Sequence, residues 1–391
     1  MRYFFCIIIL SLFIACGSSD TPKEKTPEQA AIEQDSISKL LKEIKADEKA
    51  AKIKKAFAAK VAESGLNGCV LVAQRGQILY KNAFGYTDLK TKDPLTLHSA
   101  FQLASVSKTL TAGAILLLKD QGKLKLSDNV KQYLPDFPYP NITIKLLLCH
   151  RSGLSNYIYF GEPYCDKNNC YDGKTFDNKA VLEIMKISKP APYAGPDKKF
   201  EYCNTNYALL ASIIEVVSGL SFADFMQQNI FTPLEMNDSW VHDPKKDTAH
   251  KNRTIGHNGL GKVEKEAYAD DVLGDKGIFS TVEDMFKWDQ ALYSEKLLKK
   301  ETLQEAFSGY SNEHKGKKNY GYGWRLTDDG KNPKIIYHNG WWHGYTTLFY
   351  RRPADQVTVI ILSNKFSRST YHIEEILAIL GNAPAAVDLD E

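Results

Sequence analysis

The sequence is short of net charge and has no long hydrophobic segment. In 391 residues, 50 Lys and Arg side chains are balanced by 47 Asp and Glu side chains, which leaves a formal charge of +3. No basic block or basic stripe with interleaved aromatic residues is present, and we therefore expect no nucleic-acid partner. Since 43% of the residues are hydrophobic and 25% are charged, the composition is that of a globular protein with a large core.

Cysteine is also scarce, and its spacing does not fit a metal site. Of the seven cysteines, Cys6 and Cys16 lie near the N-terminus. No second pair of ligands is spaced for zinc, so we expect no metal. Cys165 and Cys170 flank a polar segment, and in an oxidising compartment they are predicted to form a small disulfide, with buried free thiols or a metal clip as the alternatives. The other cysteines are Cys69, Cys149 and Cys203.

The N-terminal residues have the layout of an export signal. Arg2 precedes an apolar run at residues 3–14 that is too short to span a membrane and is followed by small and polar residues. Residues 12–19 resemble the bacterial lipoprotein signal, in which a cysteine that follows a small residue is lipidated after cleavage. We therefore predict a signal peptide at residues 1–15, a lipidated Cys16, and a location on the bacterial cell envelope, at the periplasmic or extracellular face. The alternative is an ordinary signal peptide with an incidental cysteine.

After Cys16, changes in composition and in the spacing of apolar residues divide the chain into a tether, a helix, a domain and a tail. Residues 16–34 are polar with two prolines and are predicted to be a flexible tether. Residues 35–62 carry apolar side chains at helical spacing between many charges, which predicts an amphipathic helix. Residues 63–385 are predicted to form one domain, followed by a tail at residues 386–391.

The domain starts and ends with strand patterns. Residues 68–86 read as a hairpin, and residues 334–337, 346–350 and 357–362 read as late strands. Residues 100–290 are mostly helical or looped. The predicted fold class is therefore α/β, with an antiparallel sheet of early and late strands, flanking helices, and an inserted helical region.

Ser105 and Lys108 form the first candidate for chemistry. A serine hydroxyl is a weak nucleophile unless a base lies within hydrogen-bond distance, and helix positions i and i+3 share a face. The apolar residues 109–118 predict a buried helix with Ser105 at its start, where burial and the helix dipole favour a neutral lysine amine. The motif alone is not specific, because residues 36–39 match it in the charged helix. A helix cap with an incidental lysine is the structural alternative.

Two more motifs follow in order. Tyr202-Cys203-Asn204 precedes an apolar helix at residues 207–219, and His338-Asn339-Gly340 lies between two predicted strands. Together the three motifs resemble the active-site motifs of the serine β-lactamase and penicillin-binding-protein superfamily, in its class C-like branch. That branch includes D-Ala-D-Ala carboxypeptidases, D-aminopeptidases and esterases. The resemblance covers residues 67 to about 380 and includes family landmarks at residues 101–108, 122–128, 147–154, 231–236 and 277–284.

The resemblance implies roles for the motif residues. Ser105 attacks the substrate carbonyl, Lys108 accepts its proton, and Tyr202 passes that proton to the leaving group. Asn204 binds Lys108 and the substrate amide. The resemblance implies no metal and no organic cofactor. The structural alternatives are a packing role for Tyr202 and, for Cys203, a small buried residue without a base beside it.

The third motif bears on the substrate. The backbone N–H groups of Ser105 and of Trp341, which follows Gly340, are the implied oxyanion donors. His338 stands where β-lactamases usually carry a lysine, and its charge varies around neutral pH. Asn339 stands where Ser or Thr is usual. We assign His338 and Gly340 to substrate binding and take the histidine form as typical of the esterase, D-peptidase and aminopeptidase members.

The sequence therefore predicts a monomeric, membrane-anchored serine hydrolase that acts through an acyl-enzyme on esters or on D-amino-acid peptides and amides. Its partner would be a small-molecule or peptidoglycan-like acyl substrate. One alternative is a β-lactamase or a penicillin-sensitive D-Ala-D-Ala carboxypeptidase. Another is a non-catalytic envelope protein that binds peptidoglycan or a partner with the inherited cleft. Fold-level kinship does not decide among these substrates.

Overall fold

The chain divides into two units, residues 1–45 and residues 46–391. The computed structural model describes residues 26–168, 176–265, 267–311, 313 and 318–381. Cys16 and Cys170 lie outside these residues, so the lipidation of Cys16 and the pairing of Cys165 with Cys170 stay predictions.

Helix α1 (Pro27–Glu43), in the first unit, begins earlier than the sequence predicts. Thr26 and Gln29 form a capping box, in which each side chain accepts the backbone N–H of the other residue. Pro27 occupies the first helical position, where its missing N–H costs nothing. The helix therefore occupies part of the predicted tether. Residues 35–62, which were predicted to form one helix, belong to two helices. The helical conformation is interrupted at Lys45, whose φ is +52°, and α2 (Ala46–Ser64) follows.

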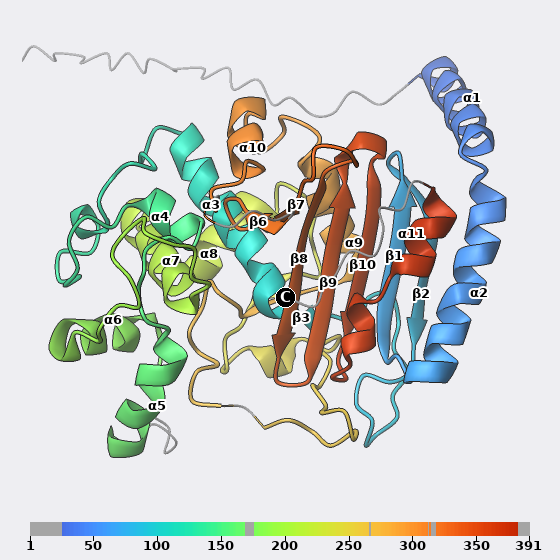
Figure 1. Ribbon diagram of the computed structural model, residues 1–391. Helices are drawn as coiled ribbons and strands as arrows, with labels where there is room; N and C mark the ends of the chain where they lie inside the picture. Colours follow the sequence, from blue (N-terminus) through green and yellow to red (C-terminus); the bar gives the residue numbers. More distant parts are fainter. Residues whose placement is uncertain (1–25, 169–175, 266, 312, 314–317, 382–391) are drawn as a thin grey trace, which may run out of the picture. The chain divides into compact units, whose positions relative to one another are not determined.

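A seven-stranded antiparallel sheet joins the two ends of the domain, which confirms the predicted fold class (Figure 1). Strand β1 pairs with β10 over its whole length, with Cys69 opposite Leu362. Every residue of β1, β9 and β10 is buried, because helices cover both faces of the sheet centre. In spatial order the strands are β2 (Gln77–Phe84), β1 (Gly68–Gln74), β10 (Val357–Ser363), β9 (Tyr345–Arg352), β8 (Ile335–Trp342), β7 (Arg325–Thr327) and β6 (Lys318–Tyr320).

Two neighbouring arginines show how the helices cover the sheet. Arg351 donates to the Asp289 carboxylate of helix α9, whereas Arg352 donates to the carbonyl of Gly381, just after α11. Successive side chains of a strand point to opposite faces, so α9 and α11 lie on opposite sides of the sheet. Helix α11 packs against α2, which also contacts β2 (Figure 1). The bounds are α9 (Val282–Ala291), α10 (Lys300–Ala306) and α11 (Glu374–Leu380).

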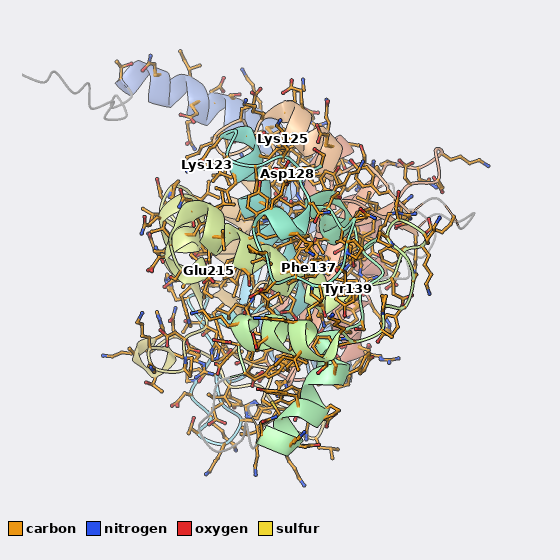
Figure 2. The ribbon with its side chains drawn as sticks, turned by 90° about the vertical axis from the view of Figure 1, so that its left-hand side faces the viewer. Lys123, Lys125, Asp128, Phe137, Tyr139 and Glu215 are labelled. Carbon is orange, nitrogen blue, oxygen red and sulfur yellow. The ribbon has the colours of Figure 1, made fainter. Side chains whose placement is uncertain are left out.

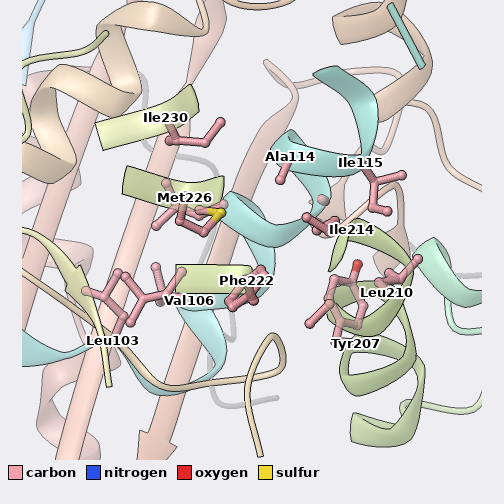
Figure 3. Close-up of a cluster of buried hydrophobic side chains, with 14 of the residues drawn as sticks. Leu103, Val106, Ala114, Ile115, Tyr207, Leu210, Ile214, Phe222, Met226 and Ile230 are labelled. Atoms are coloured by element: carbon pink, nitrogen blue, oxygen red, sulfur yellow. The ribbon is translucent and has the colours of Figure 1, made fainter. Parts of the chain in front are cut away.

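The inserted region packs around helix α3. Figure 3 shows its core, in which Val106 and Ile115 meet Tyr207 and Phe222 from other helices. On another side, a Cβ at Gly113 would lie 2.5 Å from the Trp288 ring of α9, so only glycine allows this close packing. The helices are α3 (Ser107–Asp120), α4 (Ile144–Leu148), α5 (Tyr157–Asn168), α6 (Asn178–Ser188), α7 (Asn204–Ser218), α8 (Phe222–Met226) and η3 (Gln227–Phe231).

The predicted helical region also contains a small sheet that the sequence pattern did not reveal. Its strands have only two or three residues, too few for an alternating pattern to be seen. In spatial order they are β3 (Phe101–Gln102), β5 (Ile278–Ser280) and β4 (Trp240–Val241). Short single-turn helices complete the described part: η1 (Ala104–Val106), η2 (Val130–Gln132), η4 (Asp247–Ala249), η5 (Pro353–Asp355) and η6 (Arg368–Tyr371).

The loop after α3 lies on the face of the inserted region that Figure 2 shows. Figure 2 shows Lys123, Lys125 and Asp128 of this loop, together with Glu215 of α7. The Asp128 carboxylate accepts the backbone N–H of Lys125 and the hydroxyl of Tyr133, which holds the loop in place. Among the described residues no single helix is long and apolar enough to cross a membrane; α7 with α8 and η3 passes that test only as a pair bent by 77°.

Candidate active site

Ser105 lies in the single turn η1 that leads into α3. Ala104, the preceding residue, has a φ of +48°, a strained conformation for a residue with a side chain. Lys108, in the first turn of α3, is fully buried. Its Nζ lies 3.0 Å from Ser105 Oγ and donates to the carbonyl of Asp275 at 2.8 Å. In this position a neutral amine can accept the proton of the Ser105 hydroxyl and still donate a hydrogen bond to the Asp275 carbonyl.

A buried network holds the Asp275 carbonyl. The hydroxyl of Tyr157 donates to the Asp275 carboxylate at 3.0 Å, and the Nζ of Lys276 lies 2.8 Å from the same hydroxyl. Burial lowers the pKa of Lys276, although Asp275 and other carboxylates oppose this shift. The segment that positions Lys108 is thus tied to the start of α5.

Tyr202 and Asn204 reach the same place from the start of α7. Lys108 Nζ lies 5.0 Å from the centroid of the Tyr202 ring. Asn204 Oδ1 is buried without a hydrogen-bond partner in the described part of the chain. The predicted hydrogen bond between Asn204 Oδ1 and Lys108 is therefore absent, and the acceptor for Lys108 is the Asp275 carbonyl. The unpaired oxygen is available to a substrate N–H.

His150 positions the segment that carries Tyr202. Its carbonyl accepts the N–H of Glu201, and its Nδ1 accepts the N–H of Cys203 at 3.1 Å. The two rings of His150 and Tyr202 lie 4.4 Å apart. Burial, together with the nearby Lys108 side chain, holds the pKa of His150 well below its usual value, so the imidazole is a neutral acceptor.

The third motif lies within β8, not between strands as predicted. Strand β7 pairs only with residues 335–337, so in the described structure the second half of β8 is an open edge. A Cβ at Gly340 would lie 2.9 Å from Ser105 N and 2.6 Å from the Leu103 carbonyl oxygen. Glycine is required there because the strand lies against the turn η1. The backbone of Trp341 thus comes beside that of Ser105, as two oxyanion donors need.

The His338 ring lies next to Tyr202, with the two ring centroids 6.3 Å apart. It is fully buried, with Nε2 3.0 Å from the hydroxyl of Tyr320 and Nδ1 2.7 Å from the carbonyl of Asn339. We assign the proton to Nδ1, since a carbonyl only accepts. Burial, with Arg325 and Lys108 nearby, holds the pKa of His338 well below its usual value. The ring is neutral and supports the backbone of β8, and its role in substrate binding stays a prediction.

Arg325 is the cleft residue that the sequence did not reveal. It starts β7, too short a strand to be predicted. Its guanidinium carbon lies 5.1 Å from the centroid of the Tyr202 ring, and its Nε is buried without a hydrogen-bond partner in the described structure. An arginine with unsatisfied hydrogen-bonding capacity that lines the same cleft as Ser105 is suited to bind an anionic group.

Ser105, Tyr202 and Arg325 line one cleft of about 440 Å³. Two larger hollows, of about 700 and 730 Å³, contain none of them. Predicted residues Ser105, Tyr202, Asn204, Gly340 and Trp341 line the cleft. The remaining lining residues in the described chain include no acidic side chain; they are Asn156, Ile158, Tyr159, Arg325, Asn339, Trp342, Phe366, Arg368 and Tyr371.

Comparison with known proteins identifies the family. The family model described as Beta-lactamase matches residues 53–382, and thus includes every motif above. The chain belongs to this β-lactamase family. Its relatives include penicillin-binding protein 4* of Bacillus subtilis, 35% identical over 318 residues, which covers 78% of this chain and 69% of that protein. A putative penicillin-binding protein, PbpX, of the same organism is 26% identical over 370 residues, covering 92% and 87%.

Solved structures of the β-lactamase family agree with this assignment. The octameric penicillin-binding protein homologue from Pyrococcus abyssi superimposes with a TM-score of 0.72 at 25% identity, over 84% of this chain and 77% of that one. The penicillin-binding protein from Bacillus halodurans gives a TM-score of 0.70 at 25% identity, over 81% and 96%. The chain is therefore a penicillin-binding-protein-like serine hydrolase that works through an acyl-enzyme.

The cysteines of this β-lactamase-family chain are not placed for thiol chemistry. Burial raises the pKa of the Cys203 thiol to about 11, so it is a protonated packing residue at neutral pH. Cys69 and Cys149 are free and buried. Cys165 is disulfide-bonded. In the described part of the chain, no group of three or more His, Cys, Asp or Glu side chains is arranged to hold a metal ion.

Proposed function

We propose that this hydrolase cleaves D-amino-acid peptides that end in a free carboxylate. The observation that carries the proposal is Arg325, whose Nε has no hydrogen-bond partner in the described structure and which lines the same cleft as Ser105, where the described lining has arginines but no acid. A cationic cleft favours an anionic substrate and disfavours the free ammonium of an aminopeptidase substrate. Neutral esters would gain nothing from Arg325.

The proposed mechanism assigns a step to each motif residue. Ser105 Oγ attacks the scissile carbonyl as Lys108 takes the hydroxyl proton. Tyr202 gives its phenol proton to the leaving amine as the C–N bond breaks and takes the proton from Lys108, so both side chains return to their starting states. The oxyanion is held by the N–H groups of Ser105 and Trp341. Water then attacks the acyl carbonyl and gives a proton to Lys108; the bond between the acyl carbon and Ser105 Oγ breaks, Lys108 returns the proton to Oγ, and the acyl group leaves as a carboxylic acid.

The register of β8 orients the substrate. Arg325 lies opposite Tyr337, three residues before Gly340, and Trp341 follows Gly340. At about 3.3 Å per residue, the positions of Tyr337 and Trp341 are about 13 Å apart along the strand. A peptide lying along this edge would place its carboxylate at Arg325, its scissile carbonyl at Ser105, and its acyl group at Trp341.

Replacement of Arg325 by glutamine tests the carboxylate assignment. For an acyl-D-Ala-D-Ala peptide we expect kcat/KM to fall by about 10- to 100-fold, because a charge-assisted hydrogen bond is lost. For the same peptide with a C-terminal amide we expect a fall of less than about threefold. The measurement is the steady-state rate on this matched pair of substrates.

Arg75→Gln, in the turn between β1 and β2, is the matched control and should leave both rates unchanged. Equal losses on the acid and the amide would refute a role for Arg325 in carboxylate binding. Rapid turnover of nitrocefin, which also carries a carboxylate, would favour the β-lactamase alternative over the peptidase.

We also propose that the hydrolase is attached to the cell envelope through a lipid on Cys16. The support is the sequence pattern at residues 1–19, in which a short apolar run ends in a small residue and a cysteine. The Cys16→Ser protein should move from the detergent phase to the aqueous phase in a two-phase partition. Equal partitioning of both proteins would exclude the anchor.

A further inference from the structure

A second lysine, Lys276, is buried close to the base of the nucleophile. Its residue is 2% exposed, and it follows Asp275, the residue whose carbonyl accepts a hydrogen bond from Lys108 Nζ. Lys276 is not among the described residues that line the cleft, so the steps assigned above do not use it. Burying a lysine is unfavourable unless its N–H groups are paired and its charge is balanced.

The Lys276 amine contacts three other segments of the chain. Its Nζ donates to the Tyr157 hydroxyl and to the Val272 carbonyl, each at 2.8 Å. It also lies 4.9 Å from the centroid of the Trp342 ring. Two acceptor oxygens and the face of an aromatic ring are partners that suit a charged ammonium, which can only donate.

Tyr157 connects this ammonium to Asp275. The Tyr157 hydroxyl donates to Oδ2 of Asp275 at 3.0 Å, and Lys276 Nζ lies 3.8 Å from Oδ1 of the same carboxylate. Both charged side chains are buried, so each balances the other in a medium that screens charge poorly. The chain from ammonium to hydroxyl to carboxylate is polarised in one direction, which strengthens each of its hydrogen bonds.

The backbone beside Asp275 is pressed against two helices. The hydroxyl of Thr111, in α3, donates to the Gly274 carbonyl at 2.8 Å. Gly274 has a φ of +101°, and a Cβ there would lie 2.4 Å from the carbonyl oxygen of Tyr207 in α7. Only glycine fits at this position. The Asp275 carbonyl is therefore held toward Lys108 from one side by the backbone and from the other by the Lys276 network.

Few charged groups face the two lysines. Those that attract Lys276 are carboxylates of its own loop: Asp270, Asp271 and Asp275. Burial lowers the pKa of Lys276 and Lys108 adds to that shift, whereas these carboxylates oppose it. The other titratable groups near Lys108 are rings, with Arg325 beside one of them: Tyr202, Tyr207, His150 and His338. Asp275 thus brings a carboxylate to the base, and Lys276 supplies the balancing cation.

We propose that Lys276 is a positioning residue for Lys108. Through Tyr157 and Asp275 it holds the carbonyl that binds Lys108 Nζ, and its ammonium keeps the Asp275 carboxylate from drawing a proton onto that base. The inference rests on the acyl-enzyme mechanism and not on the choice of substrate. A lysine that already carries the extra proton cannot accept one from Ser105, so this charge balance sets the pH range in which Ser105 reacts.

Charge changes of opposite sign test the proposal. The measurement is the rate at which a fluorophosphonate labels Ser105 at a series of pH values. In Lys276→Met the Asp275 carboxylate is unbalanced and favours a protonated Lys108, so the midpoint of the rate curve should rise by about 0.5 to 1 pH unit. In Asp275→Asn the Lys276 ammonium is unbalanced, and the midpoint should fall by a similar amount.

Tyr157→Phe removes the bridging hydroxyl without changing a charge. We expect the plateau rate of labelling to fall by about fivefold to tenfold, because the carbonyl that orients Lys108 is held less firmly, while the midpoint keeps its wild-type value. Lys276→Arg keeps the charge and should also keep that midpoint. Lys119→Met, near the end of α3, where Lys119 donates to Thr302, is the matched control and should change neither quantity.

Thermal unfolding reports whether each variant folds. If Lys276→Met does not fold, Asp275→Asn and Tyr157→Phe decide the question. The proposal is overturned by midpoints that move in the same direction in the two charge variants, by midpoints that do not move, or by a wild-type plateau rate in Tyr157→Phe. A wild-type protein that takes up no probe at any pH would instead refute the acyl-enzyme mechanism, and the role of Lys276 with it.

Discussion

Ser105→Ala is expected to lower turnover by at least about 10⁴-fold on every substrate, because the acyl-enzyme cannot form without the hydroxyl. The measurement is kcat/KM on the acyl-D-Ala-D-Ala peptide, with intact-protein mass spectrometry after incubation with a fluorophosphonate. The wild-type protein should gain one adduct, and Ser105→Ala should gain none.

The chain offers an internal control for this experiment. Ser36 and Lys39 repeat the spacing of Ser105 and Lys108, but Lys39 is exposed in α1 and pairs with Asp35. Ser36→Ala should therefore keep full activity and full labelling. Activity that survives in Ser105→Ala would disprove the nucleophile, and a correctly folded wild-type protein that takes up no probe would favour the non-catalytic binder.

Lys108→Met has the second largest expected effect, a loss of about 10²- to 10⁴-fold in the rate of acylation, the range for removal of a positioned base. The measurement is the single-turnover rate at which Ser105 acquires the acyl group. Folding should tolerate this change, because an apolar side chain of similar length in a buried site avoids the cost of burying an ammonium. Thermal unfolding should show a midpoint no lower than that of the wild-type protein.

Lys39→Met, on the exposed surface of α1, is the matched control and should leave acylation unchanged. If Lys108→Met acylated at the wild-type rate, the base would have to be another group. Tyr202, whose ring lies 5.0 Å from Lys108 Nζ, would be the first candidate to replace in the same assay.

The sequence pattern predicted the elements that are marked by neighbouring residues, namely the long buried strands and the helix that follows Ser105. Strands β1 and β10 could be recognised because they are buried on both faces and are therefore nearly continuous apolar runs, and β9 because it is rich in β-branched and aromatic residues. Ser105 could be distinguished from Ser36 because an apolar helix follows it, which means burial for Lys108. The short strands β6 and β7 carry no such pattern, and Arg325 was missed with them.

The structure shows side-chain contacts of two motif residues that the sequence does not report. The His338 side chain is buried against Tyr320, which no local pattern in the sequence reports, and its role in substrate binding stays a prediction. Asn204 was expected to contact Lys108. The acceptor is instead the backbone carbonyl of Asp275, a group that every residue has and that no sequence motif can mark.

The sequence alone determined the order of the motifs, from Ser105 and Lys108 through Tyr202 to Gly340. The reason is that each role needs a particular residue type: a hydroxyl for the nucleophile, an amine for its base, and a glycine where two backbone segments come close. The tertiary structure decided the electrostatics of the cleft. It buried His338 as a neutral ring and brought Arg325 beside Tyr202, because charge in a site depends on which side chains from distant segments meet and on how much water they lose.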